Sequence, residues 1–287
     1  MKIGAFTTFL PEYTFAEACQ CIKSIGYEGV QPRIVPPASV GFDPAKPYNP
    51  WGNNKGGISE TDFFADPKGV LKPATDLGLA VTSVASYTNT ADMERAVNMV
   101  KACGKAGIKN VRVGCLPMPK EDKFDYVAFT DRNRGTYKEL VSEAKKAGVR
   151  PCLELHMGTL YPGASGAVSF LRSFAPDEVG VLYDPANMIA DGWEVPKVAL
   201  NVMGAYLAEV HVKNSKWVPD GDDPRGVKKW KTVNADLADG CVNWAEIIAA
   251  LKVHGYNGWL VEEGHTEHEV TYARLKSAHT LLKKLVG

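Results

Sequence analysis

The sequence predicts an α/β protein, a single (β/α)8 TIM barrel that spans residues 1–287 and has a parallel eight-stranded core. Short apolar segments bounded by glycine or proline alternate with segments whose apolar residues recur at helical spacing. Such alternation is typical of a parallel sheet with helices outside, and eight strand–helix units suggest closure into a barrel. The composition shows no break that would mark a second domain, and this length is ordinary for one barrel.

The first half of the chain contains four of the predicted strands, at residues 2–8, 26–32, 80–87 and 110–116. The helices that follow them are predicted at residues 14–25, 61–77, 91–106 and 137–147. Pro67 and Pro73 are expected to kink or break the second helix, because proline lacks the N–H that a helix interior uses. Residues 33–59 form a long connection rich in proline and glycine, which we expect to cover the barrel mouth.

The second half contains strands at residues 150–156, 179–184, 207–213 and 258–263, and helices at residues 166–174, 195–206, 244–254 and 270–285. Each strand ends in a polar residue, and these are Glu154, Asp184, His211 and Glu263. Glu154 and Asp184 are 30 positions apart, and Asp184 and His211 are 27 apart, close to the roughly 30 residues of a βαβ unit. We therefore expect the four side chains at one height, at the C-terminal mouth where the active sites of this fold lie.

Three carboxylates and an imidazole that converge inside a protein are costly to bury unless a cation compensates them. A divalent metal ion is the simplest such cation, and an oxygen-rich site with one imidazole suits Mn²⁺, Mg²⁺ or Co²⁺, with Zn²⁺ as an alternative. Taken singly, each residue has a plainer explanation: a buried salt bridge for Glu154, a turn before Pro185 for Asp184, a hydrogen-bonded core histidine for His211. Their shared spacing favours the metal site.

The charge balance limits the classes of partner. Lys plus Arg and Asp plus Glu each total 33, which argues against nucleic acid, because phosphate binding needs a basic excess or patch. The N-terminal residues enter a predicted strand at once, and no apolar run is long enough to cross a membrane. The six cysteines include no C-x-x-C pair, which favours reduced thiols and a cytoplasmic protein. A homo-oligomer is left open.

Four motifs carry a resemblance to a known family: LELH at 153–156, YDPAN at 183–187, VHVK at 210–213 and GYNGWLVEE at 255–263. With them the chain resembles the xylose-isomerase-like TIM barrel superfamily, and within it the sugar phosphate isomerase/epimerase group, which includes D-tagatose 3-epimerase and inosose dehydratase. The resemblance implies one divalent metal, Mn²⁺ above the other ions, held by Glu154, Asp184, His211 and Glu263. It also implies that Glu154 and Glu263 act as the acid and base of an isomerase or epimerase.

The implied reaction passes through an enediolate of a small keto sugar or polyol derivative. If the second proton went to a departing β-hydroxyl, the same site would be a dehydratase of the inosose-dehydratase type, and the sequence leaves both open. The epimerases of the group have a histidine where this chain has Asn187 and an arginine where it has Trp217. The resemblance therefore supports the metal site more strongly than it supports the identity of the substrate. The absence of a glycine-rich phosphate loop near the last strands favours an unphosphorylated substrate.

Three further residues are candidates for substrate binding. His156 follows Glu154 by two positions and Lys213 follows His211 by two, so each shares the inward face of its strand. Asn187 is a candidate for a substrate hydroxyl. Adjacent strand residues face opposite sides, so Glu262 and Glu263 compete for one role. The family pattern favours Glu263, which leaves Glu262 facing the outer helices and in need of a cation.

Two other functions remain as alternatives to a sugar isomerase, epimerase or dehydratase. The apurinic endonuclease branch of the superfamily uses a three-zinc cluster with additional histidines on early strands, and no histidine precedes His156 here. A barrel that binds sugars without catalysis would retain the same site.

Overall fold

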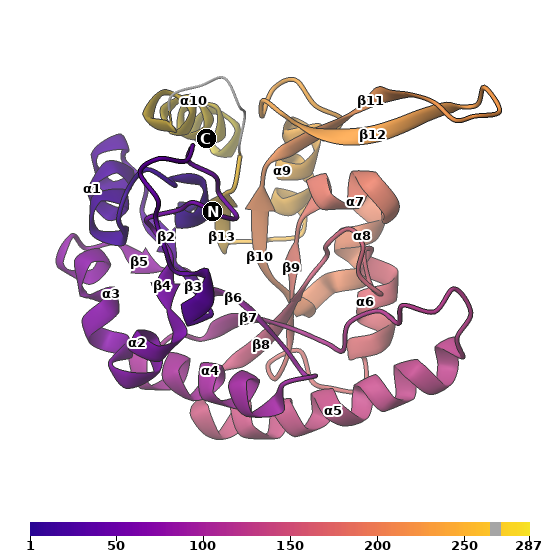
Figure 1. The fold of residues 1–287 in the computed structure, drawn as a ribbon, viewed down its shortest axis with the longest axis horizontal. Helices are drawn as coiled ribbons and strands as arrows, with labels where there is room; N and C mark the ends of the chain where they lie inside the picture. The colour runs from indigo at the N-terminus through magenta and orange to yellow at the C-terminus, as the bar shows by residue number, and fades with distance from the viewer. Residues whose placement is uncertain (265–270) are drawn as a thin grey trace.

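The computed structural model describes residues 1–264 and 271–287, and its main sheet curls into a barrel wrapped by helices (Figure 1). The paired strands of this sheet are parallel, as predicted, and the α/β barrel fold is confirmed. In chain order they are β1 (Lys2–Phe6), β2 (Gly29–Gln31), β3 (Arg33–Val35), β4 (Ile58–Ser59), β5 (Ala80–Val81), β6 (Val84–Asn89), β7 (Asn110–Gly114), β8 (Arg150–Glu154), β9 (Gly180–Tyr183), β10 (Leu207–Val212) and β13 (Trp259–Glu262).

The predicted strand at residues 80–87 is broken into two pieces, and the predicted strand at 26–32 continues past Pro32 as β3, within the segment that was predicted as a connection. Pro32 separates β2 from β3, because proline has no N–H for the sheet, and Thr82 and Ser83 separate β5 from β6. Hydrogen bonds span both breaks, from Thr82 N to Val30 O at 3.0 Å and from Ala85 N to Pro32 O at 3.1 Å. When each broken strand is counted once, the sheet has nine segments: eight follow one another around the barrel, the last of which, β13, pairs with β1, and the short β4 lies beside β3.

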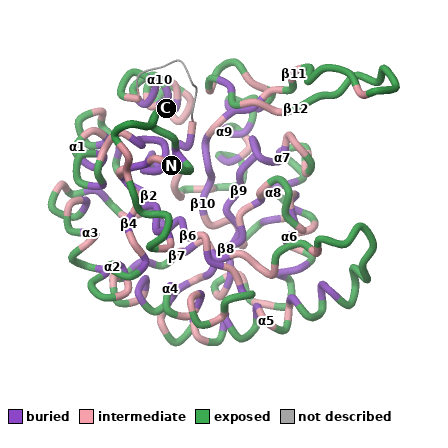
Figure 2. The backbone as a smooth tube through the Cα atoms, in the orientation of Figure 1, coloured by how far each residue is buried: buried purple, intermediate pink, exposed green. Residues whose placement is uncertain are grey.

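The outer layer consists of helices that pack their apolar sides on the strands, so the buried residues lie between the two layers and inside the barrel (Figure 2). Helix starts follow local capping: Thr14, Asp92 and Asp125 each accept a hydrogen bond from a backbone N–H three residues later. The helices are α1 (Phe15–Ile25), α2 (Glu60–Ala65), α3 (Pro67–Asp76), α4 (Met93–Ala106), α5 (Tyr126–Ala147), α6 (Ala164–Leu171), α7 (Pro185–Asp191), α8 (Pro196–Met203), α9 (Trp244–Val253) and α10 (Thr271–Val286).

The structure corrects several predicted elements. The predicted helix at 61–77 is two helices, because Asp66 ends α2 and caps α3 at Pro67, whereas Pro73 lies inside α3. Helix α5 begins at Tyr126 and not at residue 137, since Asp125 supplies its cap. Helix α7 and the antiparallel strands β11 (Asn214–Asp222) and β12 (Lys228–Ala235) were not predicted. The predicted start of the last helix at Val270 lies outside the described residues.

Strands β11 and β12 form a hairpin that projects away from the barrel (Figure 1). The long connection at residues 36–57 lies instead against the mouth. There, Asn54 donates a hydrogen bond to Thr8 O at 2.8 Å, and the Trp51 ring packs edge-on against Phe9, 5.5 Å between centroids. In the described part of the chain, no helix is long and apolar enough to cross a bilayer.

The contact between α4 and α5 gives a test of the packing. A Cβ atom at Gly104 of α4 would lie 2.5 Å from Ala147 O of α5, so we expect Gly104→Ala to lower the free energy of unfolding by about 1–3 kcal/mol. A Cβ atom at Gly135 of α5 would have no neighbouring atom within 4 Å. Gly135→Ala should therefore raise the free energy of unfolding by about 0.5–1 kcal/mol. Urea denaturation measures both, and equal effects in the two variants would contradict the close approach.

Candidate metal centre

Four side chains from the last four barrel strands meet at the C-terminal mouth. Glu154 ends β8, Asp184 follows β9, His211 belongs to β10 and Glu263 follows β13. One donor atom from each lies within 4.8 Å of the others, and the side chains are buried. His211 Nδ1 lies 3.2 Å from Glu154 Oε1 and 3.0 Å from Glu263 Oε1. The group could therefore hold one metal ion, with Nδ1 as the imidazole donor.

Two side-chain cations neutralise part of this acidic group. Arg112 of β7 places Nε 2.8 Å from Glu154 Oε2. Lys213 Nζ lies 2.6 Å from Asp184 Oδ2 and 3.0 Å from Glu263 Oε2. Buried carboxylates need such partners, because desolvation of an unpaired charge costs several kcal/mol. Lys213, predicted as a substrate-binding residue, thus contacts two of the predicted metal ligands in this structure.

The pKa values of the cluster follow from burial and from these partners. Burial raises the pKa of Glu154, but Arg112 and then His211 outweigh it and hold that pKa well below its usual range. Burial likewise opposes ionisation of Glu263, yet His211 and Lys213 lower its pKa to about 2. The pKa of Asp184 is raised, because burial and the neighbouring Glu263 outweigh the opposite effect of Lys213. Burial lowers the pKa of His211, and Glu263 with the surrounding glutamates reverses this and raises it.

A buried cluster of three polar residues, Gln31, Ser83 and Glu209, orients the Nε2 side of the His211 ring. Gln31 of β2 donates from Nε2 to Glu209 Oε1 at 2.8 Å, and the same nitrogen lies 3.2 Å from His211 Nε2. Ser83 donates to Glu209 Oε1 at 2.7 Å, and Glu209 Oε1 lies 3.5 Å from His211 Nε2. Such partners fix the tautomer and orientation of a metal-binding histidine. The sequence analysis missed these three residues, although Glu209 precedes His211 by two positions and so shares its inward face.

Asn187 positions two of the carboxylates. Its backbone N–H donates to Asp184 Oδ1 at 3.0 Å, and its Nδ2 donates to Asp184 Oδ2 at 2.7 Å and to Glu154 Oε1 at 3.5 Å. His156 is half-buried, with Nδ1 2.8 Å from Met157 O. The substrate-binding roles predicted for Asn187, His156 and Lys213 stay predictions. Trp217, which the sequence analysis singled out as a departure from the family pattern, lies on the projecting strand β11.

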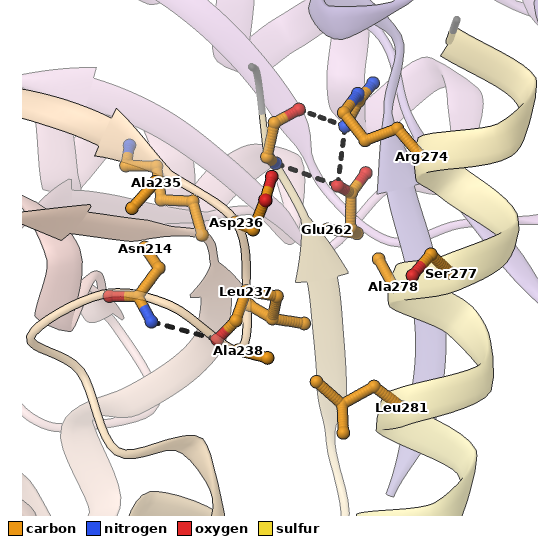
Figure 3. Close-up of a pocket in the computed structure, with 12 residues that line it drawn as sticks. Asn214, Ala235, Asp236, Leu237, Ala238, Glu262, Arg274, Ser277, Ala278 and Leu281 are labelled. Carbon is orange, nitrogen blue, oxygen red and sulfur yellow. Dashed lines mark hydrogen bonds and ion pairs between the residues drawn. The ribbon is translucent and has the colours of Figure 1, made fainter. Parts of the chain in front are cut away.

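Glu262 points away from the cluster, toward α10. Its Oε1 accepts a hydrogen bond from Arg274 Nη1 at 2.8 Å and another from Gly264 N at 2.9 Å. Figure 3 shows the Glu262 and Arg274 side chains facing one another beside a pocket of about 230 Å³ between β13 and α10. The alternation along β13 thus brings Glu263, and not Glu262, to the cluster, and Glu262 has the cation that it was expected to need.

A second pocket, of about 310 Å³, adjoins Glu154 on the side of the first-half strands. Its lining includes Tyr87, Arg112 and Thr88. The sequence analysis assigned no polar ends to these strands, because Arg112 stands between two valines and Tyr87 between small polar residues. In the sequence, the position of Arg112 within an apolar run was the sign that a charged side chain points into the barrel.

The family follows from a comparison with known sequences. Residues 19–285 match the family described as xylose isomerase-like TIM barrel. This chain belongs to that family. The Rhizopine catabolism protein MocC of Rhizobium meliloti is 28% identical over 151 residues, which make up 48% of this chain and 44% of MocC. The chain thus matches less than half the length of that relative.

Solved structures share the fold along the whole chain. A D-psicose 3-epimerase from Clostridium cellulolyticum H10, solved with D-tagatose, has a TM-score of 0.71 and 17% identity and covers 100% of this chain and 99% of its own. The 3-keto-D-glucoside 4-epimerase YcjR from E. coli has a TM-score of 0.71 and 16% identity and covers 99% of each chain. At these identities the likeness establishes the barrel, in agreement with the resemblance predicted from the sequence.

The ion pairs of Glu263 predict how stability depends on pH in the metal-free protein. Its folded pKa of about 2 lies below the unfolded value of about 4.3. The carboxylate therefore contributes stability above about pH 4.3, and this contribution is lost as the pH falls toward about 2. With EDTA present, Glu263→Gln should lower the unfolding free energy at about pH 6, and the deficit should shrink at about pH 3. Exposed Glu94 provides the control: Glu94→Gln should show no such trend, and a deficit for Glu263→Gln that is independent of pH contradicts the ion pairs.

Proposed function

We propose that this protein is a divalent-metal-dependent isomerase or epimerase of a small keto sugar or polyol derivative. The observation that supports this most is the buried group of three carboxylates and one imidazole, whose donor atoms lie within 4.8 Å of one another. Protein sites rich in carboxylate oxygen with a single imidazole suit Mn²⁺, Mg²⁺ or Co²⁺. We assign Mn²⁺ as the preferred ion and Glu154, Asp184, His211 and Glu263 as its ligands.

The donor set fits a divalent ion on two grounds. Lys213 Nζ already contacts Asp184 and Glu263, so the cluster attracts positive charge even with its carboxylates partly paired. Gln31 and Glu209 hold the far edge of the His211 ring, which leaves Nδ1 directed at the two glutamates. When bound, a divalent ion polarises a substrate carbonyl as a Lewis acid. The described residues supply the remaining steps.

The acid–base chemistry belongs to two glutamates. Glu154 and Glu263 flank His211 Nδ1 from β8 and β13, and both are ionised over the neutral range because their pKa values are lowered. In the proposed reaction, one carboxylate removes a proton from the carbon beside the carbonyl, which gives an enediolate. The other glutamate, which must first take up a proton from solvent, then delivers that proton to the opposite face and inverts the configuration, and the first glutamate releases its proton to solvent. Arg112 and Lys213 hold the carboxylates in place and stabilise the negative charge that develops.

The comparisons support this class of substrate without naming it. The two similar structures are described as epimerases of D-psicose and of a 3-keto-D-glucoside, which both carry a hydroxyl beside a carbonyl. The family match covers residues 19–285 and so includes all four proposed ligands. The exact substrate of this chain, and whether Asn187 or His156 contacts it, belong to the proposal.

Removal of one ligand tests the metal site directly. We expect Asp184→Asn to weaken Mn²⁺ binding by about 100-fold or more, because even partners of metal ligands contribute about 10–100-fold. Asp177 is exposed and precedes the N-terminal end of β9, whereas Asp184 follows its C-terminal end. Asp177→Asn therefore serves as the control. Isothermal titration of EDTA-treated protein with MnCl₂ measures both. Equal affinity in Asp184→Asn and wild type would remove Asp184 from the site.

Hydrogen exchange in heavy water tests the catalytic roles. Mn²⁺-loaded protein should introduce solvent deuterium beside the carbonyl of an intact ketose, with D-fructose, D-tagatose and D-fructuronate as trial substrates. Glu154→Gln and Glu263→Gln should each slow this exchange by about 10²–10⁴-fold, and Glu94→Gln should not. Exchange at the wild-type rate in both site variants would refute the acid–base assignment. A product that has lost water would instead assign a dehydratase.

A further inference from the structure

Arg33 is a buried arginine that lacks a carboxylate partner among the described residues. The residue is 4% exposed, and its Nε and Nη1 atoms are buried and form no hydrogen bond within the described part of the chain. Its remaining nitrogen, Nη2, donates to Trp51 O at 3.2 Å. By contrast, Arg112 and Arg274, which are also largely buried, pair with Glu154 and Glu262. Arg33 thus retains hydrogen-bonding capacity and an uncompensated charge.

The strand places this charge inside the mouth of the barrel. Val30 and Ile34 belong to the core under the helices, whereas Gln31 reaches inward to within 3.2 Å of His211 Nε2. Arg33 follows Gln31 by two positions, so it shares the inward face and lies farther toward the C-terminal mouth. Neighbouring β6, whose Ala85 is in register with Arg33, carries Tyr87 two residues later.

Tyr87 connects Arg33 to the pocket beside the metal centre. Its ring centroid lies 5.6 Å from Arg33 Cζ and 5.3 Å from Arg112 Cζ. Its hydroxyl is buried and has no hydrogen-bond partner among the described residues. Tyr87 and Arg112 line the cavity of about 310 Å³ that also reaches Glu154, a volume suited to a small ligand. Tyr87 thus links the Arg33 guanidinium to a cavity whose lining includes the Arg112–Glu154 ion pair.

A buried charge without a counter-ion is destabilising, and a cation–π contact offsets only part of that cost. The single hydrogen bond to Trp51 O leaves two guanidinium nitrogens without an acceptor. Natural proteins retain such a cost where a ligand supplies the missing partner. The missing partner of a guanidinium and a phenol is an oxyanion.

The net charge of the side chains at the barrel mouth indicates which kind of oxyanion the ligand carries. The described charged side chains that contact one another or surround the cavity comprise four carboxylates and three cations: Glu154, Asp184, Glu209, Glu263, Arg33, Arg112 and Lys213. With the His211 imidazole neutral, as a metal ligand must be, a bound divalent ion changes their formal sum from minus one to plus one. A single carboxylate brings this sum to zero, whereas a dianionic phosphate returns it to minus one.

We propose that the substrate of this enzyme is an acidic keto sugar, a ketose derivative with a carboxylate that is bound by Arg33 and the Tyr87 hydroxyl. This inference rests on the proposed function, and it names the substrate class of the same site. Residues 36–57 cover Arg33 through Trp51, so the carboxylate takes up the two free guanidinium nitrogens from the side of Tyr87. The carbonyl end of the substrate then lies toward Glu154.

Three matched ketoses test the proposal, because they differ only at the terminal carbon: D-fructose (hydroxymethyl), D-fructuronate (carboxylate) and D-fructose 6-phosphate. Their dissociation constants are measured by calorimetry on Mn²⁺-loaded wild type, Arg33→Met and Arg132→Met. Arg132 is an exposed arginine whose Cζ lies 5.0 Å from the Phe129 ring centroid, which makes it a matched control. We expect wild type and Arg132→Met to prefer D-fructuronate over D-fructose by about tenfold or more, and Arg33→Met to lose this preference while its affinity for D-fructose stays within about twofold.

Thermal unfolding provides a second readout, which separates binding from a structural role. D-fructuronate should raise the melting temperature of wild type but not of Arg33→Met, whose own melting temperature should equal or exceed that of wild type, because an unpaired buried charge is removed. Equal affinities of wild type for D-fructose and D-fructuronate overturn the proposal, as does an Arg33-dependent preference for the phosphate. A uniform loss of affinity or stability in Arg33→Met makes Arg33 structural and also overturns it. Failure of the proposed function is distinguishable, because solvent-deuterium exchange into every ketose would then be absent while the Arg33-dependent preference for D-fructuronate persisted.

Discussion

The rest of this structure depends on the burial of several carboxylates at one end of a barrel. Glu154, Asp184 and Glu263 lie within hydrogen-bonding distance of shared cations and an imidazole, away from water. Repulsion among them would open the mouth if positive charge were absent. Arg112 and Lys213 supply it from two different strands, so the site holds together before any ion or substrate arrives. Those same ion pairs keep Glu154 and Glu263 ionised.

The carboxylates of the mouth come from the second half of the barrel together with Lys213, whereas the first half contributes Arg33 and Arg112. Strands β8, β9, β10 and β13 carry the carboxylates and the histidine, whereas β3, β6 and β7 carry Arg33, Tyr87 and Arg112. Closure of the barrel brings the halves face to face. A substrate between them would contact acid–base groups at one end and cations at the other. This polarity gives an asymmetric ligand one favoured orientation, which stereochemical control of a proton transfer needs.

Asp184 shows how a local structural role and a role in the site coincide. Its Oδ1 caps helix α7 by accepting from Asn187 N, while its Oδ2 accepts from Asn187 Nδ2 and Lys213 Nζ. The sequence analysis offered two interpretations of Asp184, the start of a turn before Pro185 and a metal ligand. The two are compatible, because Oδ1 caps the helix while Oδ2 is directed at the cluster. The cap fixes the side-chain rotamer, which directs the second oxygen at the cluster.

The sequence by itself determined the barrel and the four polar strand ends, because spacing and alternation report which face of a strand is inward, and the family pattern favoured Glu263 over Glu262. It did not determine the partners of these residues. Gln31 and Glu209 are 178 positions apart, and Arg112 meets Glu154 across two strands. Only the tertiary structure decides such contacts, since they depend on barrel closure and strand register. Helix α7 was also missed because it has only seven residues, and the hairpin of β11 and β12 because most of its residues are exposed and lack a regular apolar alternation.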